Sequence, residues 1–399
     1  MEQGKLKYTV LFGGGAIRGV AYCGVLKALD ELQVEFDTLA GSSVGSVIAG
    51  LVAVGYTTQE IKDIMMGVNF ELFRDIQLAI GQNFAFSKGE VFLDWLRELI
   101  EKKFYGNDYK KGTHKSVTFS DIQKNLVIIT TDLSSFECKE FSKFETPDFE
   151  IAKAIRISSG MPGLMKPIEY NNRTLVDGDL QKSAPMWSLS KNLQPDDERI
   201  IEFRLEGDFH GTDKNAIDFI NAIYSYATRT GTKFLKDLYG CRDKYDYVLI
   251  DTGNLNIVDF NLSLERRNEL VDNAYEQTIN YFKNTLRAKK ENLLSIYENL
   301  LKYLISCKKN IEKMKYSAAK EALGTLYIDL CDFVDIINPT DKNNLKNFTN
   351  IFMQNYKPSS FFGKARLENI YLVLKTLELC ETTLSNRIHS YQEYVDKYD

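Results

Sequence analysis

The chain has 399 residues and a formal net charge of −5 at pH 7. Its length predicts one large domain or two moderate ones. The acidic balance argues against a nucleic-acid-binding protein, which would usually carry a basic face. The segment Met1–Lys5 has no apolar signal-peptide pattern, and no apolar run approaches the roughly 20 residues of a membrane-spanning helix. We therefore expect a cytoplasmic protein, with translocation by a non-classical route as the alternative.

The first half of the chain alternates short apolar runs with helical patterns. Residues 8–12 are β-branched or aromatic and stop at three glycines, which predicts a buried strand that enters a turn. Apolar positions within 20–32 have the spacing of a helix that packs on a sheet. A second short strand is predicted over 36–40, directly before Gly41. The segment 44–54 is apolar on every side, which predicts a buried helix.

Two capping boxes and two more strands follow. Thr57 with Glu60, and Ser87 with Glu90, predict the starts of two surface helices. Two further apolar runs predict strands, the first of them central: 126–133 and 247–251. Strands that alternate with helices favour an α/β fold, in which a mainly parallel sheet is sandwiched by helices.

The character of the sequence changes after about residue 287. Six apolar residues then step by four and three, the spacing of a helix seam: Leu293, Tyr297, Leu300, Leu304, Cys307 and Ile311. Turn-forming segments at 338–341 and 357–360 predict breaks between helices, and nothing after the seam indicates a strand. We therefore expect an α/β domain over 1–287 and an all-α domain over 288–399.

A candidate nucleophile lies in residues 41–45, Gly-Ser-Ser-Val-Gly. In a G-x-S-x-G pentad the serine occupies a tight, strained turn between a strand and a helix, where side chains two places away would collide. Ser43 has glycines at both offsets, whereas Ser42 does not. The helix after Ser43 would direct its positive end at the serine and favour an anion there.

A serine hydroxyl needs a base that removes its proton. The chain has three histidines, His114, His210 and His389, and none lies in a motif. A triad in the α/β-hydrolase order would use His210 or His389. Asp177 can serve instead if it lies within hydrogen-bond reach of Ser43 in a partly desolvated site. The structural alternative for Asp177 is a carboxylate that caps its own turn.

A third piece is the glycine loop, which we define as residues 13–19, Gly-Gly-Gly-Ala-Ile-Arg-Gly. Backbone amides in such a loop can receive a developing negative charge. The alternative is a tight turn without a ligand. The loop lacks the G-K-[ST] ending of a nucleotide-binding P-loop.

In this order the glycine loop, the pentad 41–45 and the pair Asp177-Gly178 resemble the motifs of the patatin-like phospholipases. That family consists of lipid acyl hydrolases that use a serine–aspartate dyad. Residues 154–162 resemble the family segment that precedes the aspartate. The resemblance spans about residues 6–285 and does not extend over the predicted helical domain.

The resemblance implies a role for each matching residue. Ser43 would be the nucleophile and Asp177 its base. The backbone amides of Gly14 and Gly15 would form the oxyanion hole, with Arg18 fixing the loop. The chemistry would need no metal and no organic cofactor.

Two positions depart from the family pattern. Ala16 replaces the third glycine of the family loop, which is tolerable where φ is negative. Asp179 stands where a small residue is usual. A second carboxylate so near Asp177 could perturb the titration of that residue or bind a cation.

The implied function is cleavage of phospholipid acyl esters through an acyl-enzyme. An enzyme of this kind needs a surface for peripheral membrane association. The aromatic segments 83–86 and 357–364 are candidates, with core packing as the alternative. The segment 288–399 is a candidate for regulation, membrane contact or binding of an activating protein. Two other functions stay open: a soluble esterase or acyltransferase, and a catalytically idle scaffold that acts through its helical domain.

Overall fold

The structure is a computed structural model that describes residues 6–74, 87–180, 199–207, 222–223, 226, 242–255, 261–333, 335–360 and 363–398. The chain divides into two compact units. The α/β unit comprises residues 1–240 and 245–279, and the helical unit comprises residues 241–244 and 280–399. The prediction of an α/β fold followed by helices is confirmed.

The α/β unit is built on a mostly parallel sheet. Its strands are β1 (Tyr8–Phe12), β2 (Thr38–Ser42), β3 (Asn125–Asp132), β4 (Glu137–Ser142), β5 (Ile168–Tyr170), β6 (Arg173–Asp177), β7 (Arg199–Glu206) and β8 (Tyr245–Asp251). The strand order is β5-β6-β3-β2-β1-β7-β8, with β4 also paired to β3. The five strands from β3 to β8 in this order run parallel, whereas β4 and β6 are antiparallel to β3 and β5 is antiparallel to β6.

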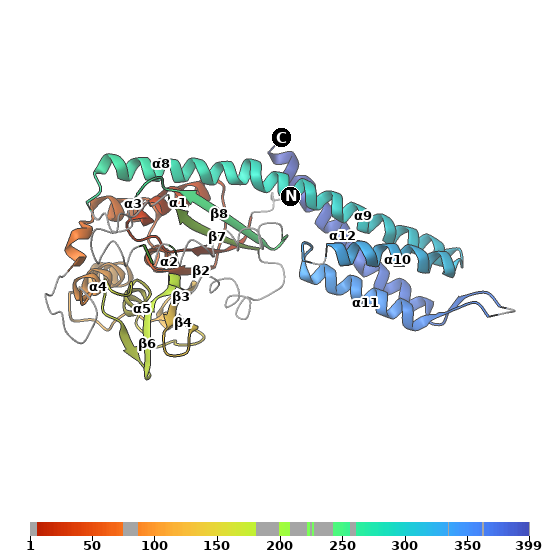
Figure 1. Cartoon of the computed structure of the whole chain (residues 1–399), viewed down its shortest axis with the longest axis horizontal. Helices are drawn as coiled ribbons and strands as arrows, with labels where there is room; N and C mark the ends of the chain where they lie inside the picture. Colours follow the sequence, from red (N-terminus) through yellow and green to blue (C-terminus); the bar gives the residue numbers. More distant parts are fainter. Residues whose placement is uncertain are drawn as a thin grey trace. The chain divides into compact units, whose positions relative to one another are not determined.

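Helices flank this sheet (Figure 1). The α-helices are α1 (Tyr22–Glu31), α2 (Val44–Ala53), α3 (Thr58–Gly67), α4 (Glu90–Tyr105), α5 (Ile151–Ser158) and α8 (Leu264–Asn280). The short 3₁₀-helices are η1 (Ala16–Ala21), η2 (Phe70–Arg74), η3 (Gly106–Asp108), η4 (Phe119–Asp121) and η5 (Gly178–Leu180). Helix α2 packs against β1, β2 and β3, and α5 packs against β3 and β6. The predicted burial of α2 is confirmed, because nine of its ten residues are buried.

Local signals located some helix starts and missed another. The Thr57–Glu60 capping box is confirmed, since each of these residues binds the backbone N–H of the other. The Ser87–Glu90 box is wrong. Gly89 is the N-cap of α4, in a left-handed conformation that suits glycine (φ 71°), and Ser87 Oγ accepts from Gly89 N instead.

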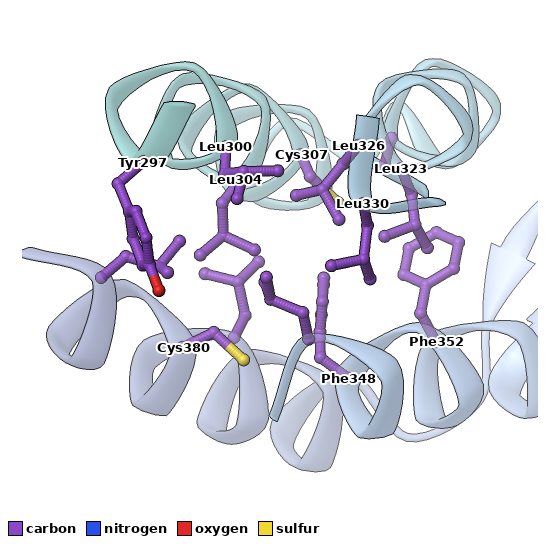
Figure 2. Close-up of a cluster of buried hydrophobic side chains, with 14 of the residues drawn as sticks. Tyr297, Leu300, Leu304, Cys307, Leu323, Leu326, Leu330, Phe348, Phe352 and Cys380 are labelled. Carbon is purple, nitrogen blue, oxygen red and sulfur yellow. The ribbon is translucent and has the colours of Figure 1, made fainter. Parts of the chain in front are cut away.

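The helical unit contains η6, a π-helical stretch (Tyr281–Thr285), followed by α9 (Leu286–Glu312), α10 (Tyr316–Asp332), α11 (Pro339–Asn355), β9 (Tyr356–Lys357), β10 (Arg366–Leu367) and α12 (Ile370–Lys397). All six predicted seam residues of α9 are buried in one apolar cluster with residues of α10, α11 and α12 (Figure 2). The expectation of no strand after the seam is wrong, because β9 and β10 form an antiparallel pair. Each strand has two residues, which is too short for an alternating pattern to reveal.

Three predicted features fall beyond the part of the chain that the structure describes. The aromatic segment 83–86, the pair Phe361-Phe362 and His210 lie outside the described residues. Of the segment 357–364, Lys357 belongs to β9. Among the described residues, no helix is both long and apolar enough to cross a membrane.

Candidate active site

Ser43 joins β2 to α2 in a strained backbone conformation, with φ 52° and ψ −130°. Non-glycine residues rarely adopt positive φ, and such strain persists only where the surroundings impose it. The flanking glycines are required by close contacts. A Cβ atom on Gly41 would lie 2.4 Å from Gly45 O, and one on Gly45 would lie 2.0 Å from Phe12 O. The steric requirement predicted for the pentad is therefore present at both positions.

Three serines hold the backbone of Ser43. Ser158 Oγ accepts from Ser43 N at 3.0 Å and donates to Ile129 O at 2.5 Å. Ser46 Oγ donates to Ser43 O at 2.5 Å, and Ser159 Oγ donates to the same oxygen at 3.3 Å. These hydrogen bonds fix the peptide groups on both sides of Ser43 and so offset the strain at this residue.

Strand β3 relates Asp177 to the strand of Ser43, because β3 pairs with both β6 and β2. Thr130 of β3 lies opposite Asp177, and the neighbouring Ile129 lies opposite Ser42. Adjacent strands are about 4.8 Å apart. Strand β4 pairs with the other edge of β3 along residues 127–132, so β2 and β6 lie along the same edge of β3, and their carboxyl ends meet there.

The turn after α5 links the same two residues. Asp177 N donates to Gly160 O at 3.0 Å, and Ser158 binds Ser43 as described above. Asp177 is fully buried, and its Oδ1 accepts from Asp179 N at 2.8 Å. This last bond is the turn cap that the structural alternative predicted. The structure thus brings Asp177 and the backbone of Ser43 to one three-residue turn, residues 158–160.

The glycine loop packs beside this junction. Gly13 N donates to Phe203 O at 2.9 Å, and the hydroxyl of Tyr22 donates to Gly13 O at 2.8 Å. The amide of Gly14, one of the two predicted oxyanion donors, donates to Asp179 Oδ1 at 3.1 Å. A substrate oxygen would therefore have to share this amide with a carboxylate of the chain itself.

The rest of the loop is strained at one residue and anchored at another. Ala16 has φ 48°, so the condition of a negative φ is not met. The left-handed conformation costs an L-residue roughly 1–2 kcal/mol. Arg18 is buried, and its Nε donates to Leu255 O at 3.0 Å, which attaches the loop to the segment after β8.

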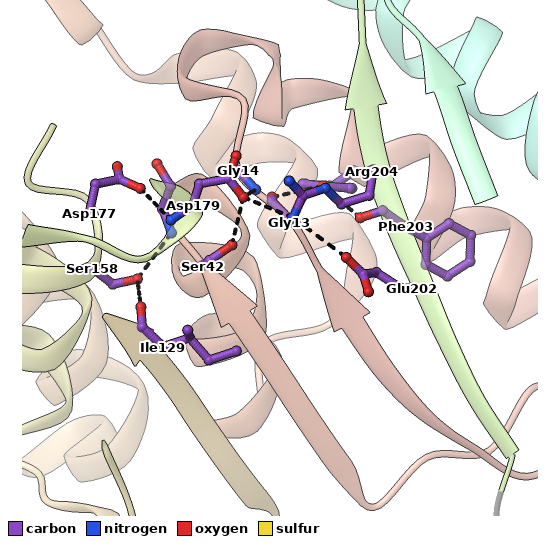
Figure 3. A network of polar contacts seen from close by, with 12 residues as sticks. Gly13, Gly14, Ser42, Ile129, Ser158, Asp177, Asp179, Glu202, Phe203 and Arg204 are labelled. Atoms are coloured by element: carbon purple, nitrogen blue, oxygen red, sulfur yellow. Dashed lines mark hydrogen bonds and ion pairs between the residues drawn. The ribbon is translucent and has the colours of Figure 1, made fainter. Parts of the chain in front are cut away.

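A buried charge network surrounds Asp179 (Figure 3). Asp179 Oδ1 accepts from Ser42 Oγ at 3.1 Å and lies 2.9 Å from Arg204 Nη1, which is 3.5 Å from Glu202 Oε1. Burial acts to lower the pKa of Arg204, but Asp179 and other neighbours outweigh it and raise that pKa. Burial raises the pKa of Glu202 to about 7. Asp179 therefore has a guanidinium partner where a bound cation had been one expectation.

The described histidines have other neighbours. The ring of His114 stacks on that of Tyr105, with centroids 4.2 Å apart. His389 has a side-chain exposure of 75% and lies 3.2 Å from Glu393. Neither arrangement resembles the buried, oriented histidine of a triad.

Sequence reasoning missed Ser158, Ser159 and Arg204. The two serines lie within the family segment 154–162, and a contact to Ser43 from so far along the chain has no local signal. Arg204 did have a local signal. Arg204 and Glu202 are two positions apart and so lie on the same face of β7, in a strand whose neighbouring apolar residues are buried. Two charges on a buried strand must be paired, so they mark a tertiary contact.

Residues 10–189 match the family model described as patatin-like phospholipase. An uncharacterised protein of Acanthamoeba polyphaga mimivirus is 29% identical over 280 residues, which cover 68% of this chain and 92% of that protein. A probable lipid hydrolase of Invertebrate iridescent virus 6 is 30% identical over 194 residues, 46% of this chain and 63% of that protein. The crystal structure of VipD from Legionella pneumophila has a TM-score of 0.49 at 14% identity, covering 98% of this chain and 91% of that chain.

Proposed function

Because residues 10–189 form a patatin-like phospholipase domain, we propose that the protein cleaves fatty-acyl esters of phospholipids through Ser43 and Asp177. The observation that carries the proposal is the strained backbone of Ser43, held by the same turn that binds Asp177. Strain of this kind concentrates at functional sites. The relative named as a lipid hydrolase supports the substrate class.

The reaction would proceed in two steps. Ser43 Oγ attacks the ester carbonyl carbon while Asp177 accepts the hydroxyl proton. The tetrahedral intermediate then expels the alcohol, which takes the proton from Asp177 and leaves an acyl group on Ser43. Water, deprotonated by Asp177, attacks the acyl-enzyme and releases the fatty acid, so that Ser43 recovers its proton.

The glycine loop would stabilise the oxyanion. The Gly14 amide already donates to Asp179, so we assign the larger share to the amide of Gly15. The N-terminal end of α2 adds positive potential at Ser43. Losing one preorganised donor of this type typically costs about 10²–10³ in rate.

The substrate class requires contact with a membrane surface. We assign peripheral membrane association to the protein and regulation, by lipid or by an activating protein, to the helical unit. These assignments follow from the insolubility of phospholipids in water.

The test compares the wild type with Ser43→Ala and Asp177→Asn. Fatty-acid release from phospholipid vesicles, and hydrolysis of a short-chain ester, are measured by mass spectrometry and absorbance. We expect both substitutions to lower kcat by at least about 10³-fold, as for other serine hydrolases that lose a member of the site. His210→Ala should retain activity, whereas its loss would indicate a triad.

His389→Ala serves as the matched control, because this side chain is exposed and lies in the helical unit. Wild-type turnover no greater than that of Ser43→Ala, with or without cell lysate as a source of activator, would contradict the proposal. That result would favour a scaffold that acts through the helical unit.

A further inference from the structure

Asp179 touches every piece of the proposed site. Its Oδ1 accepts from Gly14 N and from Ser42 Oγ, both at 3.1 Å. Its backbone N–H donates to Asp177 Oδ1 at 2.8 Å. One residue thus connects the glycine loop, the strand that carries the nucleophile and the turn of the base, as Figure 3 shows.

Arg204 supplies the positive charge that this arrangement needs. Its Nη1 lies 2.9 Å from Asp179 Oδ1, and the two side chains are 5% and 6% exposed. Arg204 also lies against the glycine loop, because a Cβ atom on Gly13 would be 2.5 Å from Arg204 Cδ. Three donors, from Gly14, Ser42 and Arg204, therefore converge on one carboxylate oxygen.

A buried pair of this kind is costly to break, since the remaining charge loses its partner in a region that excludes water. The pair should therefore stay in place during turnover. This favours a permanent role in the architecture of the site over a carboxylate that leaves the Gly14 amide to admit substrate.

We propose that Asp179 and Arg204 are positioning residues that hold the glycine loop in register with Ser43. This inference rests on the proposed function. By binding Gly14 N, Asp179 fixes the peptide plane between Gly13 and Gly14, which leaves φ and ψ of Gly14 as the only soft dihedrals between that plane and the amide of Gly15. A donor held in this way acts on charge that develops in the transition state. If the amide of Gly15 is no longer held in this way, kcat falls and KM stays nearly unchanged.

Four variants separate the contributions. Asp179→Asn keeps the size and an acceptor oxygen but removes the charge, whereas Asp179→Leu removes the acceptor. The double substitution Asp179→Leu/Arg204→Met also removes the buried cation that the single leucine variant leaves unpaired. Asp246→Asn is the matched control, because Asp246 is fully buried in the same sheet and lies 2.9 Å from Arg199.

We expect Asp179→Leu and the double variant to lose about 10²-fold in kcat, the effect of a missing oxyanion donor, with KM changed less than about threefold. Asp179→Asn should restore kcat to within about tenfold of the wild type, because its amide oxygen still accepts from Gly14. Asp246→Asn should retain wild-type kcat. A folded double variant with wild-type kcat would overturn the proposal. So would a rise in kcat, since it would mean that the carboxylate blocks the Gly14 amide.

Hydrogen–deuterium exchange gives a readout that does not depend on activity. Amides in residues 12–18 should exchange faster in Asp179→Leu than in the wild type, and those of Asp246→Asn should be unchanged. If the wild type is no more active than Ser43→Ala but exchange still rises, the proposed function fails and the link to the loop stands. If exchange in 12–18 does not change, the positioning role fails whatever the activity.

Discussion

At the scale of single residues, the site combines a predicted pair with an unpredicted one. Ser43 could be proposed as the nucleophile because steric rules restrict which residues fit a strand-to-helix turn, whereas the role of Asp177 as its base is what the family resemblance implies. The partnership of Asp179 with Arg204 could not be predicted, since the two residues are 25 positions apart (204 − 179) and meet only through the order of strands. Both roles of Asp179, as an acceptor for Gly14 and for Ser42, depend on that order.

Glu202 gives the network a measurable pH dependence. Burial raises its pKa to about 7, whereas an unfolded glutamate titrates near 4.3. Between these values the folded chain keeps a proton that the unfolded chain has lost, so stability is full at low pH and falls as the pH rises through this window. At 1.36 kcal/mol per pKa unit, the loss is on the order of 4 kcal/mol.

Glu202→Gln removes the titrating group. We therefore expect the difference in the free energy of unfolding, variant minus wild type, to increase as the pH rises from 4.5 to 7.5. Urea unfolding of both proteins at several pH values measures this difference. The contributions of the other titrating groups are the same in both proteins and cancel in it. A difference that does not change with pH would mean that Glu202 titrates normally.

At the scale of helices and strands, close backbone approaches decide which positions tolerate a side chain. Gly24 of α1 faces α8, where a Cβ atom would lie 1.9 Å from Val271 O. A Cβ atom on Gly67, at the end of α3, would meet nothing within 4 Å. Both are glycines near or within helices of the same unit, which makes them a matched pair.

Gly24→Ala should lower the free energy of unfolding of the α/β unit by about 1–3 kcal/mol, because α1 and α8 must move apart. Gly67→Ala should raise it by up to about 1 kcal/mol, because alanine favours the helix and meets no obstacle. Thermal denaturation of the two variants checks the contrast. Equal effects would show that α1 and α8 do not approach as closely as described.

The elements that the sequence predicted correctly are those with long or uniform patterns. Helix α2 is apolar on all sides and β3 has eight residues, so both were evident. The start of α4 was assigned to the wrong cap because Ser87 binds Gly89 locally instead of capping the helix. A capping box and a serine turn share the same residue types, and only the backbone conformation distinguishes them.

At the scale of the whole molecule, the helical unit includes four residues that precede β8. Within that unit, Asp243 N donates to Ile336 O at 2.7 Å, and Asp243 Oδ1 lies 3.4 Å from Lys290 Nζ. Both side chains are buried, at 1% and 7% exposure. The change in composition near residue 287 could not reveal this segment, because four residues are too few to alter a pattern.

Asp243→Asn should therefore destabilise the helical unit, by about 3 kcal/mol if Lys290 keeps its charge. Glu381→Gln is the control, because the pair of Glu381 with Lys308 is 2.7 Å long but partly exposed and should contribute less than about 1 kcal/mol. Hydrogen–deuterium exchange across α9 and α12 measures both. Equal protection in the two variants would show that the segment 241–244 is dispensable.

This discontinuity has a consequence for how the bundle could be exchanged. A chimera cut once, between residues 279 and 280, would acquire a foreign bundle but retain Asp243 from its original host. Exchange of the whole helical unit, with β8 and α8 kept, therefore needs three junctions: before residue 241, after residue 244 and after residue 279. Residues 241–244 and residues 280–399 should accordingly be inherited together.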